Sequence, residues 1–282
     1  MFNTTGPDER FNDGTRTRRR ILPLGAAIGA ATLVFAGSPD RAQAADFLGS
    51  ASSFAVLAGS TVTNKGTTLL TGDLGVSPGT ALTDFSDTSV TGSTHAGDAV
   101  AAQAQVDLTT AYTTLAGLTP STNLSGINLG GLTLTAGVYR FNSSAQLTGG
   151  LILDAQNNPN ALFVFQIGET LTTASLSSVT FINGGAADNL YWQVGSSATL
   201  GTNTAFRGSI VALTSITLTT GATIEDGRAL ARNAAVTLDT NRITVPLAAT
   251  ATVAPEPGSL ALVLPVLGAV GMVLRRRRTY AA

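Results

Sequence analysis

Residues 215–240 read SITLTTGATIEDGRALARNAAVTLDT, and this stretch contains the pattern Thr-Leu-x-Thr twice, 20 residues apart. Apolar and hydroxyl residues alternate around each copy, as they do in a β-strand whose side chains point to opposite faces. If Ile216 and Leu218 point inward, the neighbouring Ser215, Thr217 and Thr219 point outward. The stretch therefore predicts two short strands, each with an outer side of small hydroxyl residues.

The Thr-Leu-x-Thr pattern recurs through the second half of the chain. Its copies begin at Thr170, Thr199, Thr217 and Thr237, with a variant at Thr133. The last three begin 18 and 20 residues apart, and the interval of 37 residues from Thr133 to Thr170 is about two such steps, with residues 146–148 in the middle position. A period near 20 is typical of a β-solenoid, in which each coil contains three short strands and neighbouring coils pair in parallel.

Stacked coils lie about 4.8 Å apart, so the outward residues of successive copies should form a flat ladder. Ala198, Leu200, Val236 and Leu238 share the inward phase of Ile216 and Leu218. The predicted ladder consists of Thr133, Thr135, Thr148, Thr170, Thr172, Ser197, Thr199, Ser215, Thr217, Thr219, Ala235 and Thr237. Its residues are uncharged, and Asp239 lies at one end.

One segment, about residues 96–117, predicts a long helix. It is rich in alanine, and its apolar residues recur at steps of three and four. This stripe consists of Ala101, Ala104, Leu108, Tyr112 and Leu115. Ser93 or Thr94 can cap the start, Asp98 suits the first turn, and Gly117 and Pro120 can end the helix. Because one side is apolar, we expect the helix to lie along the solenoid.

Both ends of the 282-residue chain carry patterns typical of processing signals. Residues 1–44 predict a signal peptide, with Arg16 and Arg18–Arg20 before an apolar run and Ala42-Gln43-Ala44 as the cleavage site. The arginines also fit a twin-arginine signal loosely, so the export route stays open. Residues 251–282 predict a sorting tail, and residues 45–250 the folded domain.

The predicted tail contains Pro255-Glu256-Pro257, an apolar segment at 260–274 and the cluster Arg275, Arg276, Arg277 and Arg278. This order resembles the sorting tail of Gram-negative bacterial proteins that an exosortase processes. The resemblance implies transient membrane anchoring, cleavage near Pro-Glu-Pro and delivery to the cell surface or extracellular matrix. A permanent single-span anchor is the alternative, although about 20 apolar residues are usual for a span.

The composition of the central domain argues against several classes of function. Residues 45–250 carry six basic and twelve acidic side chains, a net charge of −6, which disfavours a nucleic-acid partner. The chain has no cysteine, so a packed core rather than disulfides must stabilise it. Acidic loop repeats that would bind Ca²⁺ are not evident, and we expect no metal and no cofactor.

The chain resembles the microbial secreted ice-binding proteins, which fold as an irregular β-solenoid with one long helix alongside. The matching stretches are LGSASSFAVLAGSTVTN (48–64), TGDLGVSPGT (71–80), GGLTLTAGVYRF (130–141), ALFVFQIGETLTTA (161–174), NLYWQVGSSATLGTNTAFRGSI (189–210) and GRALARNAAVTLDTNRIT (227–244). The resemblance implies a mainly β fold, a discontinuous right-handed parallel β-solenoid with three-sided coils. It also implies a monomer that adsorbs to ice crystals through one flat face, and so inhibits ice growth and recrystallisation or attaches cells to ice.

Two other functions compete with ice binding. A structural or adhesive matrix protein could have the same solenoid without affinity for ice, because exposed threonine is common on β-sheets. A carbohydrate-active enzyme would need paired carboxylates, whereas Glu225-Asp226 and Asp84/Asp87 resemble loop residues. Residues 75–79 match Gly-x-Ser-x-Gly, but Pro78 removes the N–H that an oxyanion hole uses, and His95 is the only histidine. We therefore expect no catalytic site.

Overall fold

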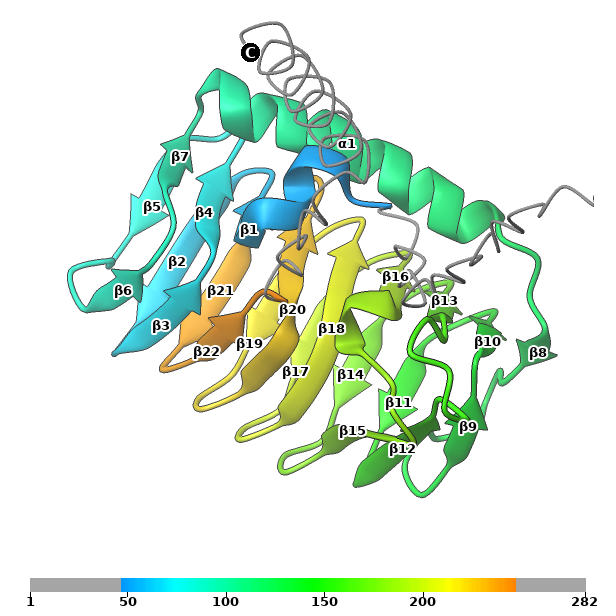
Figure 1. Ribbon diagram of the computed structural model, residues 1–282. Coiled ribbons are helices and arrows are strands. Elements are labelled where there is room, and N and C mark those ends of the chain that lie inside the picture. Colours follow the sequence, from blue (N-terminus) through cyan, green and yellow to red (C-terminus); the bar gives the residue numbers. More distant parts are fainter. Residues whose placement is uncertain (1–46, 247–282) are drawn as a thin grey trace, which may run out of the picture. The chain divides into compact units, whose positions relative to one another are not determined.

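The coils of the chain stack side by side in the computed structural model, which describes residues 47–246 (Figure 1). Each coil passes through three faces in the same order, and strands on each face pair in parallel with those of the neighbouring coils. The β-solenoid predicted from the 20-residue period is therefore confirmed. The predicted signal peptide (1–44) and sorting tail (251–282) lie outside the described residues.

One face is a sheet of seven strands, which we call the threonine face. In spatial order its strands are β11 (Ala145–Leu147), β14 (Leu171–Thr173), β17 (Ala198–Leu200), β19 (Ile216–Leu218), β21 (Val236–Asp239), β2 (Thr61–Lys65) and β5 (Ala81–Thr83). The strands formed by the Thr-Leu-x-Thr copies at 170, 199, 217 and 237 all lie on this face.

The other two faces belong to one sheet of 15 strands that bends around a corner. The face that we call the mixed face contains β9 (Thr133–Thr135), β12 (Gly150–Asp154), β15 (Ser178–Ile182), β22 (Arg242–Thr244), β3 (Thr68–Thr71) and β6 (Thr88–Val90). The helix-covered face contains β8 (Thr122–Asn123), β10 (Gly137–Phe141), β13 (Phe163–Ile167), β16 (Leu190–Val194), β1 (Phe54–Ala58), β4 (Asp73–Val76) and β7 (Thr94–Ala96).

Two long strands, β18 (Ala205–Ala212) and β20 (Thr223–Ala231), run from the mixed face onto the helix-covered face. The register between them shifts at the corner, between Arg207 and Ser209. Gly208 has φ +86° there, and a Cβ atom at this position would lie 2.7 Å from the Leu190 carbonyl oxygen. The bend therefore requires glycine for its backbone conformation and for the close approach of two coils.

The coils do not stack in sequence order. β21 pairs with β2, and β20 pairs with β1, so the N-terminal strands stack on the last coil of the chain. The coil after the helix, which begins with β8, lies at the opposite end of the stack. The solenoid is thus discontinuous, and its C-terminal coil lies inside the stack rather than at an end (Figure 1).

Helix α1 (Ala99–Gly117) connects β7 at one end of the stack to β8 at the other (Figure 1). Ala101, Ala104, Leu108 and Leu115 are buried as predicted, together with Ala111, whereas Tyr112 is only partly buried. The predicted cap was wrong: Thr94 lies in β7 and Ser93 precedes that strand, while the Asp98 carboxylate accepts a hydrogen bond from the Ala101 N–H at 2.9 Å. The helix therefore begins three residues later than predicted.

A search of residues 47–246 for a helix with the length and apolar character of a membrane span finds none.

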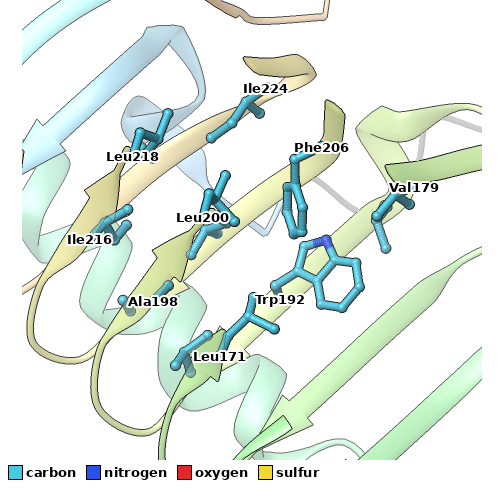
Figure 2. Packing of buried hydrophobic residues seen from close by; sticks show 14 of the residues in the cluster. Leu171, Val179, Trp192, Ala198, Leu200, Phe206, Ile216, Leu218 and Ile224 are labelled. Carbon is cyan, nitrogen blue, oxygen red and sulfur yellow. The ribbon is translucent and has the colours of Figure 1, made fainter. Parts of the chain in front are cut away.

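The core fills the inside of the coils. Tyr139, Phe165 and Trp192 from three successive coils stack on one another, with ring centroids 5.3 and 4.1 Å apart, and the Phe206 ring lies tilted against Trp192 at 4.9 Å. Figure 2 shows Trp192 and Phe206 among inward leucine and isoleucine residues of neighbouring strands. A second cluster lies between α1 and the helix-covered face. These packed layers hold the backbone of the threonine face in place.

Candidate functional site

An unbroken column of side chains runs across all seven strands of the threonine face. The register places in one line Gln146, Thr172, Thr199, Thr217, Thr237, Thr63 and Thr83. Six of these seven residues are threonine. All seven are exposed or half-exposed, so the column is open to solvent over its whole length.

The alternation of each strand fixes the direction of these threonines. On either side of Thr217 the side chains of Ile216 and Leu218 are fully buried, and Figure 2 shows them pointing into the core. Ala198 and Leu200 flank Thr199 in the same way, and Val236 and Leu238 flank Thr237. The predicted inward and outward phases of the three repeats are confirmed.

A second column lies two residues earlier on each strand. It contains Ser144, Thr170, Ser197, Ser215, Ala235, Thr61 and Ala81. The hydroxyls of Thr170 and Ser144 lie 2.8 Å apart, and those of Ser197 and Ser215 lie 2.9 Å apart. These contacts between neighbouring coils restrict the rotamers of the hydroxyl groups. Apart from the Gln146 amide at one end, the two columns together form a surface of small hydroxyl and methyl groups, and no residue in them is charged.

The face ends on the side where the strands leave it. Two residues beyond the first column lie Gly201, Thr219, Asp239 and Lys65, so this line is no longer a threonine column. The hydroxyl of Thr219 donates to the Leu200 carbonyl oxygen at 2.8 Å. A hydrogen bond from the Thr220 hydroxyl lowers the pKa of Asp239, and Lys65 lies beside it in register. Charged residues therefore border the face without entering its two columns.

The predicted ladder was wrong at its N-terminal end. Thr133 and Thr135 lie in β9, which pairs with β12 on the mixed face. Thr148 follows β11, and its hydroxyl and N–H bind the Asn128 side chain. The Thr-Leu-Thr of β9 belongs to a different side of its coil, since a repeat in sequence does not specify which of three faces its strand occupies.

Sequence reasoning missed the contributions of β2 and β5. Thr63 continues the column beyond Thr237, and Thr83 continues it beyond Thr63. The alternation in Thr61-Val62-Thr63 is the local signal for an outward threonine. That signal could not place the strand, because nothing in its sequence indicates that it pairs with a strand 174 residues later.

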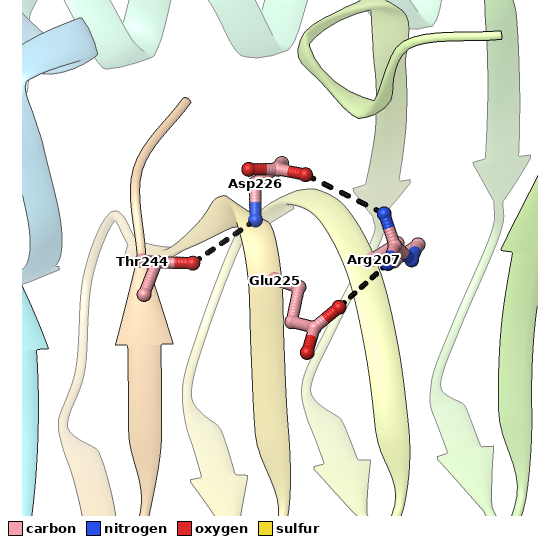
Figure 3. Close-up of polar contacts among 4 residues, drawn as sticks. All are labelled: Arg207, Glu225, Asp226 and Thr244. Atoms are coloured by element: carbon pink, nitrogen blue, oxygen red, sulfur yellow. Dashed lines mark hydrogen bonds and ion pairs between the residues drawn. The ribbon is translucent and has the colours of Figure 1, made fainter. Parts of the chain in front are cut away.

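The mixed face differs from the threonine face because it carries charged side chains and large exposed apolar side chains. Figure 3 shows Arg207 between two carboxylates, with its guanidinium 2.6 Å from Glu225 and 3.4 Å from Asp226. Both acids lie within β20, which corrects their prediction as loop residues; the Asp226 N–H binds the Thr244 hydroxyl. Large apolar side chains, those of Leu69, Ile152 and Ile182, are also exposed on this face. Of the three faces formed by residues 47–246, only the threonine face is both uncovered by α1 and free of charge along its columns.

One pair of neighbouring carboxylates, Glu225 and Asp226, occurs in the described part of the chain, and Arg207 binds both of them. Residues 47–246 contain no cluster of three or more His, Asp or Glu side chains that could hold a metal ion. His95 is 2.7 Å from the helix cap Asp98, and Ser77 is buried after β4. Trp192 is fully buried in the core, so it is not exposed as a platform for a sugar.

Comparisons with known proteins agree with one another. The family described as Ice-binding-like matches residues 56–244. An ice-binding protein from Nostoc sp. (strain HG1) is 58% identical over 219 residues, which cover 77% of this chain and 81% of the relative. The crystal structure of an ice binding protein from an Antarctic biological consortium is 51% identical, with a TM-score of 0.69, and the match covers 71% of this chain and 90% of that one. The ice-binding protein of Antarctomyces psychrotrophicus is 41% identical, also with a TM-score of 0.69, over 71% of this chain and 98% of that one.

Proposed function

The chain belongs to the Ice-binding-like family, and from this premise we propose that it adsorbs to ice crystals through the threonine face. Adsorbed protein inhibits the growth and recrystallisation of ice, or attaches the cell that carries it to ice. The observation that carries the choice of face is the register of six threonines across six neighbouring strands, without a charge among them.

Threonine suits this surface for physical reasons. Ice is a fixed lattice of hydrogen-bond donors and acceptors, so a charged or flexible side chain gains little when it leaves liquid water for it. A threonine hydroxyl can join an ordered water network, the methyl group restricts the neighbouring water, and branching at Cβ keeps χ1 in few rotamers.

Affinity must come from the number of contacts rather than from the strength of each. A single hydroxyl that exchanges liquid water for ice replaces one hydrogen bond with a similar one, so its net gain is small. The parallel strands hold neighbouring threonines about 4.8 Å apart, and the packed core keeps that spacing fixed. Many weak contacts at fixed spacing can then form together, without loss of side-chain freedom at each.

We further propose that the protein acts without catalysis, as a monomer, at the cell surface or in the extracellular matrix. The binding of Glu225 and Asp226 by Arg207 and the single histidine, His95, next to the helix cap support the first point. Localisation rests on the sequence of the two ends, the arginine-led apolar run before residue 44 and the Pro-Glu-Pro tail. Transient anchoring and exosortase-type processing of that tail would deliver the protein to its site. Cell fractionation with an antibody to the domain tests this directly: the proposal predicts a surface or released product shortened at the tail.

A recrystallisation assay tests the function. Ice grains are annealed just below the melting point with the protein, with buffer, and with the same protein after thermal unfolding. We expect grain growth to stop only with the folded protein. If grains coarsen as fast with the folded protein as in buffer, the chain does not bind ice, and a structural or adhesive matrix protein becomes the favoured function. Turnover of a polysaccharide panel would instead support a carbohydrate-active enzyme.

A further inference from the structure

The threonine face crosses a junction between two chain segments that are far apart in sequence. On one side lies β21, near the end of the described chain, and on the other lies β2, near its beginning. Between consecutive coils of one segment the chain itself limits the register, but at this junction it does not. Thr63 and Thr83 join the column only while the N-terminal coils stay docked on β21 in register.

A buried polar residue lies at this junction where its neighbours are apolar. Asn64 is 1% exposed and points inward from β2. Its register partner on β21 is Leu238, and Leu218 and Leu200 occupy the same inward line on β19 and β17. An amide in a leucine column lowers stability unless it is fully hydrogen-bonded.

The Asn64 amide is hydrogen-bonded on both sides. Its Nδ2 donates to the Gly66 carbonyl oxygen at 2.7 Å and to the Thr88 hydroxyl at 3.0 Å. Its Oδ1 accepts a hydrogen bond of 2.7 Å from the Thr68 hydroxyl, which is buried. The amide therefore connects the corner that follows β2 with the start of β6. These two positions belong to the two N-terminal coils.

Thr68 carries the connection across the junction. Its hydroxyl oxygen accepts a hydrogen bond of 3.1 Å from the Asn241 N–H, 173 residues away in sequence. The Asn241 side chain in turn donates to the carbonyl oxygens of Thr219 and Ala222, at 2.9 and 3.0 Å. The four side chains of Asn64, Thr68, Thr88 and Asn241, which we call the corner network, thus link four successive coils.

We propose that the corner network positions the N-terminal coils on β21, so that Thr63 and Thr83 extend the ice-binding column. Asn64 and Thr68 are positioning residues, because they do not reach the surface that contacts ice. A buried amide disfavours other registers, since a displaced strand would leave it without partners. The functional part of this inference rests on the proposed function, whereas the docking itself does not.

Hydrogen exchange tests the docking in the full chain. Asn64→Leu supplies the residue that neighbouring strands have in the same line, and Thr68→Val removes only the hydroxyl that crosses the junction. We expect each variant to speed exchange of the β2 and β5 amides by about tenfold or more, while β13 and β16 keep their parental rates, because opening becomes local. Trp192, the only tryptophan, reports by its fluorescence that the core is folded.

Thr173→Val is the matched control. Thr173 is a buried inward residue of the same line on β14, and its hydroxyl is 2.9 Å from that of Thr204, within one continuous chain segment. This variant should leave exchange in β2 and β5 unchanged. The proposal is overturned if β2 and β5 keep their parental rates in folded Thr68→Val and Asn64→Leu, or if exchange rises equally in β13 and β16.

Ice assays separate this inference from the proposed function. If the parental protein inhibits recrystallisation, Asn64→Leu should require a several-fold higher concentration for the same effect, and Thr173→Val should not. An inactive parental protein would contradict the proposed function alone, since the exchange rates would still decide whether the network docks the N-terminal coils. Full activity of Asn64→Leu together with fast exchange in β2 would contradict the positioning role.

Discussion

At the scale of single residues, the chain has few charged or reactive side chains, and the same residue type has different roles at different positions. Threonines in the first column are open to solvent, whereas Thr68, Thr173 and Thr204 are buried and hydrogen-bonded inside the coils. The sequence pattern alone does not separate these two uses of threonine. Their separation requires the phase of each strand, which neighbouring leucine and isoleucine residues supply for Thr199, Thr217 and Thr237.

Asp98 provides a prediction about pH. The Ala101 N–H and then His95 lower the pKa of its carboxyl below the ordinary value of 3.8. At a pH between the two pKa values the unfolded state binds more protons, so the carboxylate stabilises the fold above about 3.8 and loses this effect as pH falls through the folded pKa. We expect Asp98→Asn to lower Tm at neutral pH and to make the fall of Tm on acidification shallower.

Thermal unfolding followed by circular dichroism, from neutral pH to about pH 2.5, measures this effect. Asp87→Asn, which changes an exposed carboxylate in the loop before β6, is the control and should leave the slope nearly unchanged. If the slope for Asp98→Asn equals that of the parental protein, the carboxylate cap does not contribute to the pH dependence of folding.

At the scale of elements, the helix and the repeat strands followed directly from periodicity. The buried stripe of α1 was predicted almost completely, because a spacing of three and four residues reports one helical side. The cap was missed because Asp98, Ser93 and Thr94 are all suitable capping residues in sequence, and β7 occupies the position of Thr94. What ends the helix was also only partly visible from the sequence.

The C-terminal end of α1 is held by a residue from another element. The Gln166 Nε2 group of β13 donates to the carbonyl oxygens of Leu115 and Leu118, at 2.7 and 2.8 Å. Gln166→Leu would remove this donor from the Leu118 carbonyl and leave the Leu115 carbonyl only the 3.4 Å bond from the Leu118 N–H, which costs about 1–3 kcal/mol of unfolding free energy. We expect urea denaturation to show a loss in this range.

Gln193→Leu is the matched control for the helix end. Gln193 is the register partner of Gln166 on β16 and is also buried, but its side chain makes no hydrogen bond among residues 47–246. The change should therefore alter the unfolding free energy much less than Gln166→Leu. Equal losses in the two variants would mean that packing of the side chain, rather than its bonds to α1, accounts for the effect.

At the scale of the whole molecule, the face exists because two segments of the chain complete one sheet. Five strands of the threonine face come from residues after α1 and two from residues before it. Periodicity predicted the solenoid, and the four full repeats were placed on the correct face, whereas the variant at Thr133 was not. The order of the coils could not be predicted, because each pairing is specified by contacts between strands distant in sequence.

This arrangement predicts that threonines from both segments act as one surface. Thr63→Tyr and Thr199→Tyr place the same bulky group on the column, one on either side of the junction. Since both lie in one register, we expect similar losses of recrystallisation inhibition, measured as the concentration that halves grain growth. A loss confined to Thr199→Tyr would show that the N-terminal strands do not contact ice.

The most direct test of the central claim compares two tyrosine substitutions on different faces of one protein. Thr217 lies in the middle of the threonine column, and Thr133, from a similar sequence pattern, is exposed on the mixed face. We predict that Thr217→Tyr raises the concentration needed to stop recrystallisation by about tenfold or more, equivalent to at least about 1.4 kcal/mol of binding free energy, and that Thr133→Tyr leaves it unchanged. The account is contradicted if folded Thr217→Tyr keeps parental activity, or if Thr133→Tyr loses as much.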